Sequence, residues 1–323
     1  MTNLQPLSLA LRNEVKKFLE HHTNPGDRLL LAISGGYDSI ALCHIMQSLH
    51  QEHGVTLSTL TVDHSLQELS SDWTKKTIAR IQAMGVGEAE SVQVKVDIDS
   101  PEGLEAAARA ARYEALQTRA NEIGARAIVL AHTLDDQAET VLLRLAQGAS
   151  TNSIAAMRQI QGNLWRPLLN VRRSTLREYL SDFSLEAIDD PHNHDSRFTR
   201  VRVREELMPH LIDVLGKDVL KALATTARLA AIDADTLDLI TDSRYADVVL
   251  QGEVQCELLK RELPAIQHRI IHRWLSEQGS PRCSNEHVKD ALRLASENQL
   301  KGPLRVPGIE IVKESGTLRA VRS

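Results

Sequence analysis

The chain has 323 residues, of which 42% are hydrophobic, and carries a formal net charge of −5. This length and apolar content suit a globular protein with two domains and exclude a disordered one. No uncharged apolar run approaches the roughly 20 residues of a membrane span, and the early charges Glu14, Lys16 and Lys17 do not fit a signal peptide. We therefore expect a cytoplasmic protein, and the net charge alone does not suggest a nucleic-acid partner.

The three cysteines are far apart and form no C-x-x-C pair. They are Cys43, Cys256 and Cys283. This spacing predicts neither a disulfide framework nor a clustered zinc site, and each is expected to be a small buried residue.

Short apolar runs alternate with helical patterns through the first part of the chain. Strands are expected at 29–33, 56–62, 92–98 and 127–131, with helical patterns after them at 40–46, near 69–84, at 104–123 and at 135–147. This alternation predicts an α/β fold, a doubly wound and mostly parallel sheet with helices on both faces.

The last part of the chain has a different pattern. Helices are expected at 216–242, 264–278 and 285–297, followed by strands near 308–313 and 317–321. The predicted domains are therefore 1–215 and a smaller, mainly helical domain at 216–323.

The segment Ser34-Gly35-Gly36-Tyr37-Asp38-Ser39 joins the first expected strand to its helix. Unpaired N–H groups and the dipole at a helix start favour an anion, and glycine allows a ligand to approach the backbone closely. An ordinary tight turn with a polar cap is the alternative for a Gly-Gly pair. Because the turn has no lysine, it is not a Walker loop. The sequence predicts a phosphate site.

Other polar residues follow neighbouring strands. Asp63 and His64 come after the second expected strand, and His132 comes after the fourth. Ligands of parallel sheets bind at the carboxyl ends of the strands, so these residues should share one crevice with the loop. An Asp-His pair is also a common turn or helix cap, and that alternative stays open.

The helix after the fourth strand begins with three acids. Glu139 is spaced i,i+4 from Asp135 and i,i+3 from Asp136, so it can share a face with either. Two such carboxylates could hold a metal ion or a proton, whereas all three could also merely complement the helix dipole. Their position on the same side as the phosphate loop, where Mg²⁺ would be needed, favours the first reading.

One stretch of the chain is basic. Residues 197–204 contain four arginines and no acid, and four more arginines precede them, at 166, 172, 173 and 177. The acids on either side make a solvated, ion-paired face as plausible as a nucleic-acid contact.

The Ser34–Ser39 loop resembles the SGGxDS loop of the PP-loop family, the N-type ATP pyrophosphatases. Later segments are similar to motifs of the tRNA(Ile)-lysidine synthase family: VDHxL at 62–66, E-x-x-x-R-x-x-R-Y at 105–113, HxxxDQxET at 132–140, RPLL at 166–169 and D-x-x-N-x-D-x-x-F-x-R at 190–200. The chain departs from the family pattern at Ala131, Gln67, Val201 and the glycine-poor segment 151–157.

This resemblance implies an AMP-forming ligase that joins L-lysine to C2 of the wobble cytosine in a tRNA(Ile) with a CAU anticodon. ATP and Mg²⁺ are the implied cofactors. ATP would be held by Ser34, Gly35, Gly36, Tyr37, Asp38, Ser39, Asp63 and His64, and Asp38 would contact the metal. The implied catalytic residues are Asp38, His132, Asp136 and Glu139, of which Asp136 and Glu139 would orient the lysine amine and accept its proton. The implied contacts to tRNA or adenylate are Arg109, Arg112, Arg200 and Arg204.

Two alternative functions and three further expectations remain at this point. The chain could be another PP-loop enzyme, such as a tRNA thiolase or an amide-forming ligase, although thiolation normally needs paired cysteines. It could also be a nucleotide-binding protein that contacts tRNA without chemistry. An aromatic content of only 3% gives little support for a base-stacking platform. Residues 216–323 are expected to bind tRNA, and a homodimer is compatible with the sequence.

Overall fold

The computed structural model describes residues 5–64, 70–97, 100, 103–148, 150–187, 195, 197–280, 283–297 and 302–322. The chain forms two compact units, Met1–Leu229 and Ala230–Ser323. The long helix α10 (Val219–Val248) contributes to both units. The predicted domains, 1–215 and 216–323, stay a prediction.

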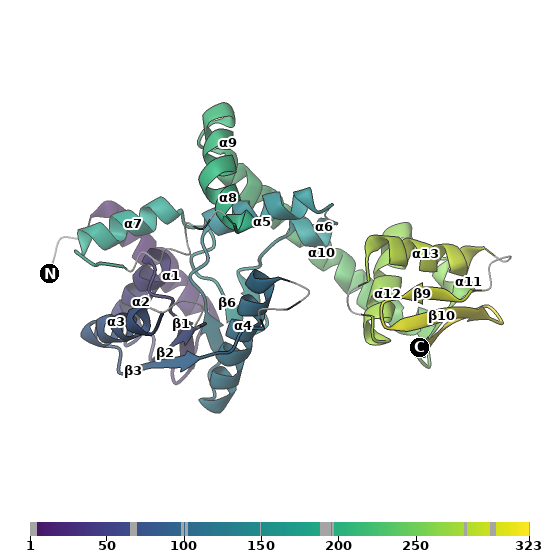
Figure 1. Ribbon diagram of the computed structural model, residues 1–323, viewed down its shortest axis with the longest axis horizontal. Coiled ribbons are helices and arrows are strands. Elements are labelled where there is room, and N and C mark those ends of the chain that lie inside the picture. The colour runs from purple at the N-terminus through teal and green to yellow at the C-terminus, as the bar shows by residue number, and fades with distance from the viewer. Residues whose placement is uncertain are drawn as a thin grey trace. The chain divides into compact units, whose positions relative to one another are not determined.

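The first unit is built on a six-stranded sheet with the order β3-β2-β1-β4-β6-β5 (Figure 1). Its strands are β1 (Arg28–Ala32), β2 (Thr56–Asp63), β3 (Glu88–Gln93), β4 (Ala127–Val129), β5 (Ile160–Gln161) and β6 (Leu164–Trp165). All neighbours pair in parallel except β5 and β6. The predicted α/β fold with a mostly parallel sheet is confirmed.

Helices cover both faces of this sheet because successive strand residues point to opposite sides. Leu29 and Leu31 belong to a core that includes residues of α1 (Pro6–His22), α2 (Tyr37–Leu49), α3 (Ser70–Ala83) and α7 (Arg173–Asp182). Leu30, between them, packs in a second core with Leu116 and Ala120 of α4 (Leu104–Glu122). Burial on both faces explains why the strand is a continuous apolar run.

The third strand differs from the expected range. It spans Glu88–Gln93, whereas the sequence predicts 92–98. Residues 58–63 of β2 pair with residues 88–93, and Val94 donates its N–H to the carbonyl of Asp63. Because β2 ends at Asp63, the alternating valines beyond this point lie past its end. Several helices of the structure, α1 and α7 among them, were not predicted.

The segments that carry the later motifs pack together. They comprise α5 (Leu134–Ala146), α6 (Thr151–Ile154), α8 (Thr199–Arg202), a π-helical turn η2 (Val203–Leu207) and α9 (Met208–Leu215). Leu134 and Ala138 of α5 share a small core with Met208 and Leu220. This core fixes the residues around 200–208 against α5.

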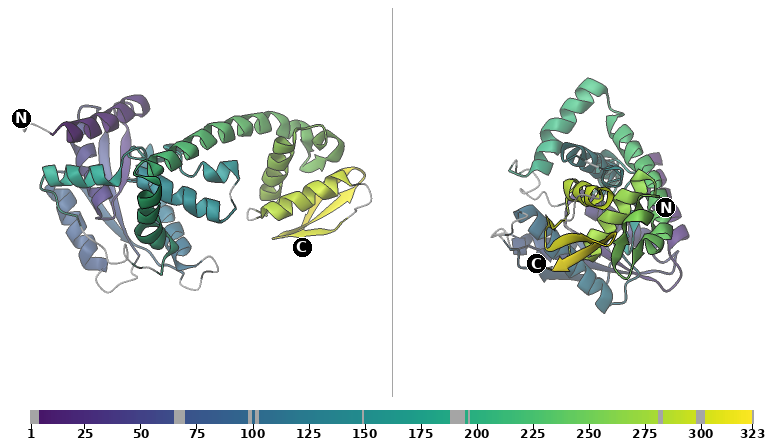
Figure 2. Two further views of the ribbon diagram at one scale, coloured as in Figure 1. Left: turned by 90° about the horizontal axis from the view of Figure 1, so that it is seen from above. Right: turned by 90° about the vertical axis from the view of Figure 1, so that its right-hand side faces the viewer.

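The second unit has its own core and a five-stranded antiparallel sheet, ordered β7-β8-β11-β10-β9. The strands are β7 (Val249–Leu250), β8 (Glu253–Gln255), β9 (Leu304–Val306), β10 (Ile309–Glu314) and β11 (Thr317–Arg322). Its other helices are α11 (Cys256–Leu259), α12 (Pro264–Glu277) and α13 (Asn285–Ser296), and Figure 2 shows α13 beside the yellow sheet. The smaller C-terminal domain is confirmed, with more strand than the sequence predicts. In the described part of the chain, no helix is long and apolar enough to cross a membrane.

Candidate active site

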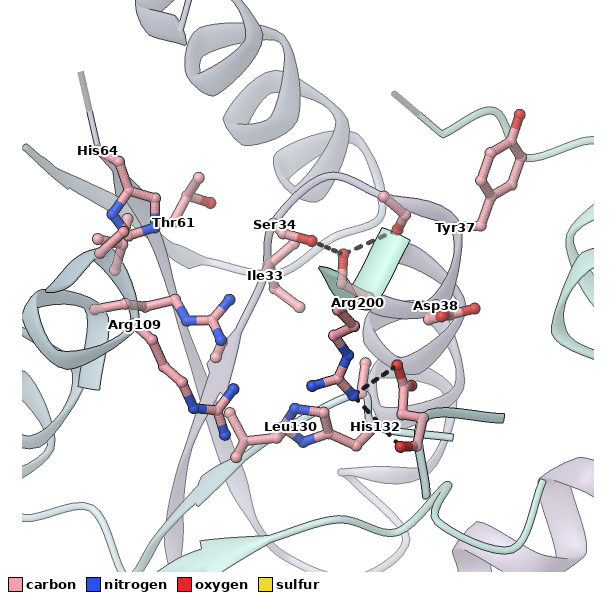
Figure 3. Close-up of a pocket in the computed structure, with 18 of the residues that line it drawn as sticks. Ile33, Ser34, Tyr37, Asp38, Thr61, His64, Arg109, Leu130, His132 and Arg200 are labelled. Carbon is pink, nitrogen blue, oxygen red and sulfur yellow. Dashed lines mark hydrogen bonds and ion pairs between the residues drawn. The ribbon is translucent and has the colours of Figure 1, made fainter. Parts of the chain in front are cut away.

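A cavity of about 1210 Å³ lies in the first unit, where β1, β2 and β4 end (Figure 3). Its walls include most of the residues singled out in the sequence: Ser34, Gly36, Tyr37, Asp38, Ser39, Asp63, His64, Arg109, Arg112, His132, Asp136, Arg200 and Arg204. The expectation that the strand ends share one crevice is therefore met. The roles of these residues stay proposals.

The phosphate loop is built for close approach to its backbone. Gly35 has φ of 88°, a left-handed conformation that favours glycine. Gly36 caps α2 without any side-chain hydrogen bond to the helix start. The Ser39 hydroxyl donates to the Gly36 carbonyl at 2.9 Å and lies 3.3 Å from the Ser34 hydroxyl. Hydroxyls thus tie the loop from within, while the start of α2 keeps N–H groups that a phosphate could accept.

Asp38 lies in the phosphate loop, and one of its two carboxylate oxygens has no described hydrogen-bond partner. Its Oδ2 accepts a hydrogen bond from Arg173 Nε at 3.3 Å. Its Oδ1 is buried and has no hydrogen-bond partner among the described residues. Burial raises the pKa of Asp38 to about 6, against the opposing effect of Arg173. Arg173 therefore satisfies one oxygen of this carboxyl group and leaves the other without a described hydrogen-bond partner.

Arg173, at the start of α7, joins this loop to the acids of α5. Its Nη2 donates to Asp136 at 2.9 Å and its Nη1 to Glu139 at 3.1 Å, besides the contact to Asp38. Although burial opposes its charge, these three carboxylates and that of Asp135 hold the pKa of Arg173 above its usual range. One guanidinium therefore connects two elements that lie far apart in sequence.

Two more arginines complete the cluster from α8 and η2. Arg200 Nε donates to Glu139 Oε2 at 3.1 Å, and Arg204 donates to both oxygens of Glu139 at 2.9 and 3.1 Å. Glu139 is 1% exposed, lies behind the cavity wall and is bonded on both oxygens. The acids predicted from the i,i+3 spacing are thus held by three arginines.

Asp136 has a second partner set at the start of α5. Its Oδ2 accepts from the Thr133 N–H at 2.9 Å and from the Thr133 hydroxyl at 2.7 Å. The Asp136 N–H in turn donates to the Thr133 hydroxyl oxygen at 3.3 Å, which completes a capping box. Although burial opposes ionisation, the charges of Arg173 and Arg200 hold the pKa of Asp136 well below its usual range. Asp136 therefore caps the helix and also belongs to the ionic cluster.

His132 lies between Arg109 and Arg200 in the cavity wall (Figure 3). Its Nδ1 is buried and has no hydrogen-bond partner within the described residues. Burial lowers the pKa of His132 to about 3, and nearby arginines act in the same direction. The imidazole is therefore neutral near pH 7 and offers one donor and one acceptor nitrogen.

A second group of arginines surrounds Tyr113 on α4. The guanidinium carbons of Arg109 and Arg112 lie 4.9 and 5.6 Å from the centre of the Tyr113 ring. Burial lowers the pKa of Arg112, and the side chain forms no ion pair with the described residues. Arg109 and Arg112 differ from Arg200 and Arg204 in this respect, because their charge is not neutralised by the cluster of acids.

Gln137 anchors the segment that departs from the family pattern. Its side-chain amide donates to the Met157 carbonyl at 2.9 Å and accepts from the Met157 N–H at 3.0 Å. The buried glutamine of the DQxET motif therefore holds the chain after α6 against α5. Two other departures from the family pattern lie in the protein interior: Ala131 packs against the main core, and Val201 is buried. The third, Gln67, lies outside the described residues. Residues 190–194 and 196, which belong to the D-x-x-N-x-D-x-x-F-x-R motif, also lie outside them.

Arg173 is the principal site residue that the sequence did not single out. In the sequence, Arg173 stands out only as one of four arginines, with Arg166, Arg172 and Arg177, that precede the basic stretch at 197–204. Its partners are 34 to 135 residues away, so no local spacing relates them. The available signal was a basic residue shortly after the RPLL motif.

The described residues contain no group of three or more His, Cys, Asp or Glu side chains suited to a metal ion. Cys43 and Cys256 are buried, Cys283 is half-buried, and all three are free thiols. The expected burial is thus met for the first two, and these cysteines do not form a cluster.

Comparisons with known proteins identify the family. A family model described as a PP-loop domain matches residues 7–211, and one described as a TilS substrate binding domain matches residues 255–319. The chain is 38% identical to the tRNA(Ile)-lysidine synthase of Leifsonia xyli over 92% of this chain and 91% of that protein. It is 37% identical to the synthase of Salinispora tropica, over 99% and 98% respectively.

The solved U34-tRNA thiolase of Methanococcus maripaludis, which holds a [4Fe-4S] cluster, is a more distant likeness. It aligns with a TM-score of 0.57 and 14% identity, covering 70% of this chain and 79% of the thiolase, and supports the fold alone. The close relatives and both family models agree with the motifs read from the sequence. This chain belongs to the tRNA(Ile)-lysidine synthase family.

Proposed function

We propose that this chain joins L-lysine to C2 of the wobble cytosine in a tRNA(Ile) with a CAU anticodon. The observation that carries the proposal is a single cavity that combines a phosphate loop with a cluster of acids and arginines, in a chain similar to curated synthases along almost its whole length. AMP and pyrophosphate would be the other products.

Different parts of the cavity lining suit the two ends of ATP. The N–H groups at the start of α2 and the Ser34 and Ser39 hydroxyls suit the pyrophosphate portion. Buried apolar side chains such as Leu60 and Leu130 line the floor and suit the adenosine end. Asp63 and His64, at the end of β2, stand beside this floor. The α-phosphorus would then face the open side of the cavity.

Asp38 fits a magnesium ion better than the other acids do. Mg²⁺ is commonly held by one or two carboxylates together with substrate phosphates, and Asp38 Oδ1 is a buried carboxylate oxygen without a described partner. The oxygens of Glu139 are taken up by arginines. A magnesium ion there would neutralise phosphate charge during attack at the α-phosphorus.

The first chemical step forms an adenylated RNA. The C2 oxygen of the cytosine attacks the α-phosphorus, the bond to the bridging oxygen breaks, and pyrophosphate leaves. The target base must leave the anticodon stack to reach this position, as in other base-modifying enzymes. Arg109 and Arg112 suit contacts to RNA phosphates or to the adenylate, because their charge is not neutralised by acids.

In the second step the ε-nitrogen of lysine attacks C2, and AMP departs with the former C2 oxygen. The amine is protonated near pH 7 and must first lose a proton, which passes to solvent. Asp136 is suited to orienting the lysine, but its low pKa makes it a weak base. Glu139 acts through the arginines that it holds, as a positioning residue. Neutral His132 can donate a hydrogen bond to the adenylate or accept one from the amine.

The second unit, with its match to a substrate binding domain, is proposed to bind the tRNA outside the anticodon. A cytoplasmic location and a homodimer remain proposals of the same kind.

The test is incubation with ATP, Mg²⁺, ¹⁴C-labelled L-lysine and a tRNA(Ile) transcript that carries the CAU anticodon. We expect labelled lysine in the RNA and the formation of an equal amount of unlabelled AMP. A transcript with uridine in place of the wobble cytosine is the matched control and should take up no label. Absence of label in the first RNA, alongside an active synthase, would contradict the proposal.

A further inference from the structure

The structure contains one exposed aromatic ring among its described residues, and that ring lies at the cavity. Tyr37 is 38% exposed, whereas the other described aromatic side chains are buried or half-buried. It is the first residue of α2 and the variable position of the phosphate loop. Three of the ten aromatic residues of the chain line this one cavity: Tyr37, Trp73 and Phe198.

The guanidinium of Arg177 lies over one face of the Tyr37 ring. The guanidinium carbon of Arg177 lies 5.4 Å from the ring centre, and Arg177 also lines the cavity. Arg173 and Arg177 are one turn apart on the same face of α7; Arg173 contacts the acids, and Arg177 lies over the ring of Tyr37. Arg177 forms no ion pair with any described residue. The pair therefore presents an aromatic surface and an available positive charge.

We propose that Tyr37, backed by Arg177, is a stacking platform for a base of the anticodon loop next to the target cytosine. This inference rests on the proposed function. Aromatic rings bind unstacked RNA bases, and arginine adds cation–π and phosphate contacts. A low aromatic content gave little support for such a platform in the sequence, but the structure gathers the few rings where RNA would enter.

The position of Tyr37 favours a base of the RNA over the adenine of ATP. The ring belongs to the loop proposed to hold the pyrophosphate, and in Figure 3 it stands apart from the group around Leu130 and His132. Adenine would occupy the apolar floor beside Leu60 and Leu130. The RNA must approach from the open side, where an exposed ring can meet it.

Binding of a 17-nucleotide anticodon stem-loop RNA with the CAU anticodon tests the platform, with the full chain and a non-hydrolysable ATP analogue. Because stacking on one aromatic ring contributes about 1–3 kcal/mol per base, Tyr37→Ala should weaken RNA binding by about 5- to 150-fold. Tyr37→Phe and Tyr37→Trp should retain wild-type affinity. Arg177→Leu should have an intermediate effect, and Arg126→Leu, which removes the guanidinium 5.9 Å from Trp165 outside the cavity, should have none.

A second set of RNAs separates stacking from a disturbed loop. Each loop nucleotide is replaced in turn by an abasic one, and at one position the difference between wild type and Tyr37→Ala should disappear. The affinity for the ATP analogue should change less than about twofold, since in the proposed orientation ATP would meet the backbone of the loop at Tyr37 and not its ring.

Equal RNA affinity of Tyr37→Ala and wild type would overturn the platform, and a loss confined to the ATP analogue would assign the ring to adenine instead. If Tyr37→Ala loses affinity equally for every abasic RNA, the ring supports the loop and does not stack. If any of these three results is obtained while the wild-type protein still transfers lysine to the tRNA, the stacking inference fails and the proposed function stands. If the wild type neither binds the RNA nor transfers lysine, the proposed function fails with it.

Discussion

Replacing Arg173 by methionine removes the one side chain among the described residues that contacts acids of both the phosphate loop and α5. Its partners Glu139, Asp136 and Asp38 have side chains that are 2%, 11% and 22% exposed. Breaking a buried ion pair from one side generally costs about 3–5 kcal/mol, because the remaining charge is left without compensation. Glu139 keeps two arginines and Asp136 keeps its capping bonds, so we expect Arg173→Met to lower the free energy of unfolding by about 2–3 kcal/mol.

Urea denaturation followed by fluorescence measures this change, since Trp73 and Trp165 lie in the first unit. The adjacent Arg172 is the matched control. Its side chain is 36% exposed and contacts Asp135 at 3.2 Å, so Arg172→Met should cost less than about 1 kcal/mol. Arg173→Lys keeps the charge without the planar fork and should lie between. Equal unfolding free energies for the Met variants at 172 and 173 would refute the view that Arg173 holds the cluster together.

Other substitutions test separate parts of the site. Asp38→Asn should lower the rate of AMP formation by roughly 100-fold, because it removes the carboxylate proposed to bind magnesium; an unchanged rate would show that this oxygen has no such role. Gln137→Leu removes the side-chain partner of the half-buried N–H and carbonyl of Met157 and should cost about 0.5–1.5 kcal/mol, with faster hydrogen exchange at the Met157 amide; slow exchange in the variant would contradict the anchoring role. The pKa of His132, lowered to about 3 from 6.5, means that the unfolded chain takes up this proton at higher pH than the folded chain. The stability associated with neutral His132 is therefore complete above pH 6.5 and is lost as the pH falls toward 3, so His132→Asn should lose less stability than wild type between pH 6.5 and about 4. A parallel loss in both proteins would show that His132 is not the titrating group.

Local pattern was sufficient for much of the fold. The apolar run at residues 29–33 and the glycines after it predict β1, the loop and α2 in their observed order. Parallel strands end at one edge, so Asp63 and His132 could be placed beside the loop before any contact was known. The spacing of Asp136 and Glu139 likewise placed both acids on one face of α5.

Contacts between distant residues were beyond the reach of the sequence. Asp38 and Arg173 are 135 residues apart, and no periodicity relates them. The three arginines around Glu139 come from α7, α8 and η2, whose approach to α5 depends on tertiary packing. The bounds of β3 were also predicted wrongly, at 92–98. The strand ends at Gln93 because its partner β2 ends at Asp63, although the alternating valines continue beyond this point.

The fate of the cytosine C2 oxygen tests the adenylation chemistry most directly. The tRNA is prepared with ¹⁸O at C2 of the wobble cytosine, incubated with ATP, Mg²⁺ and L-lysine, and the products are analysed by mass spectrometry. We predict one ¹⁸O in each molecule of AMP and none in pyrophosphate or in the modified base, because this oxygen leaves with the adenylate. AMP without the heavy oxygen, or lysine-bearing RNA that retains it, would contradict attack of the cytosine oxygen on the α-phosphorus.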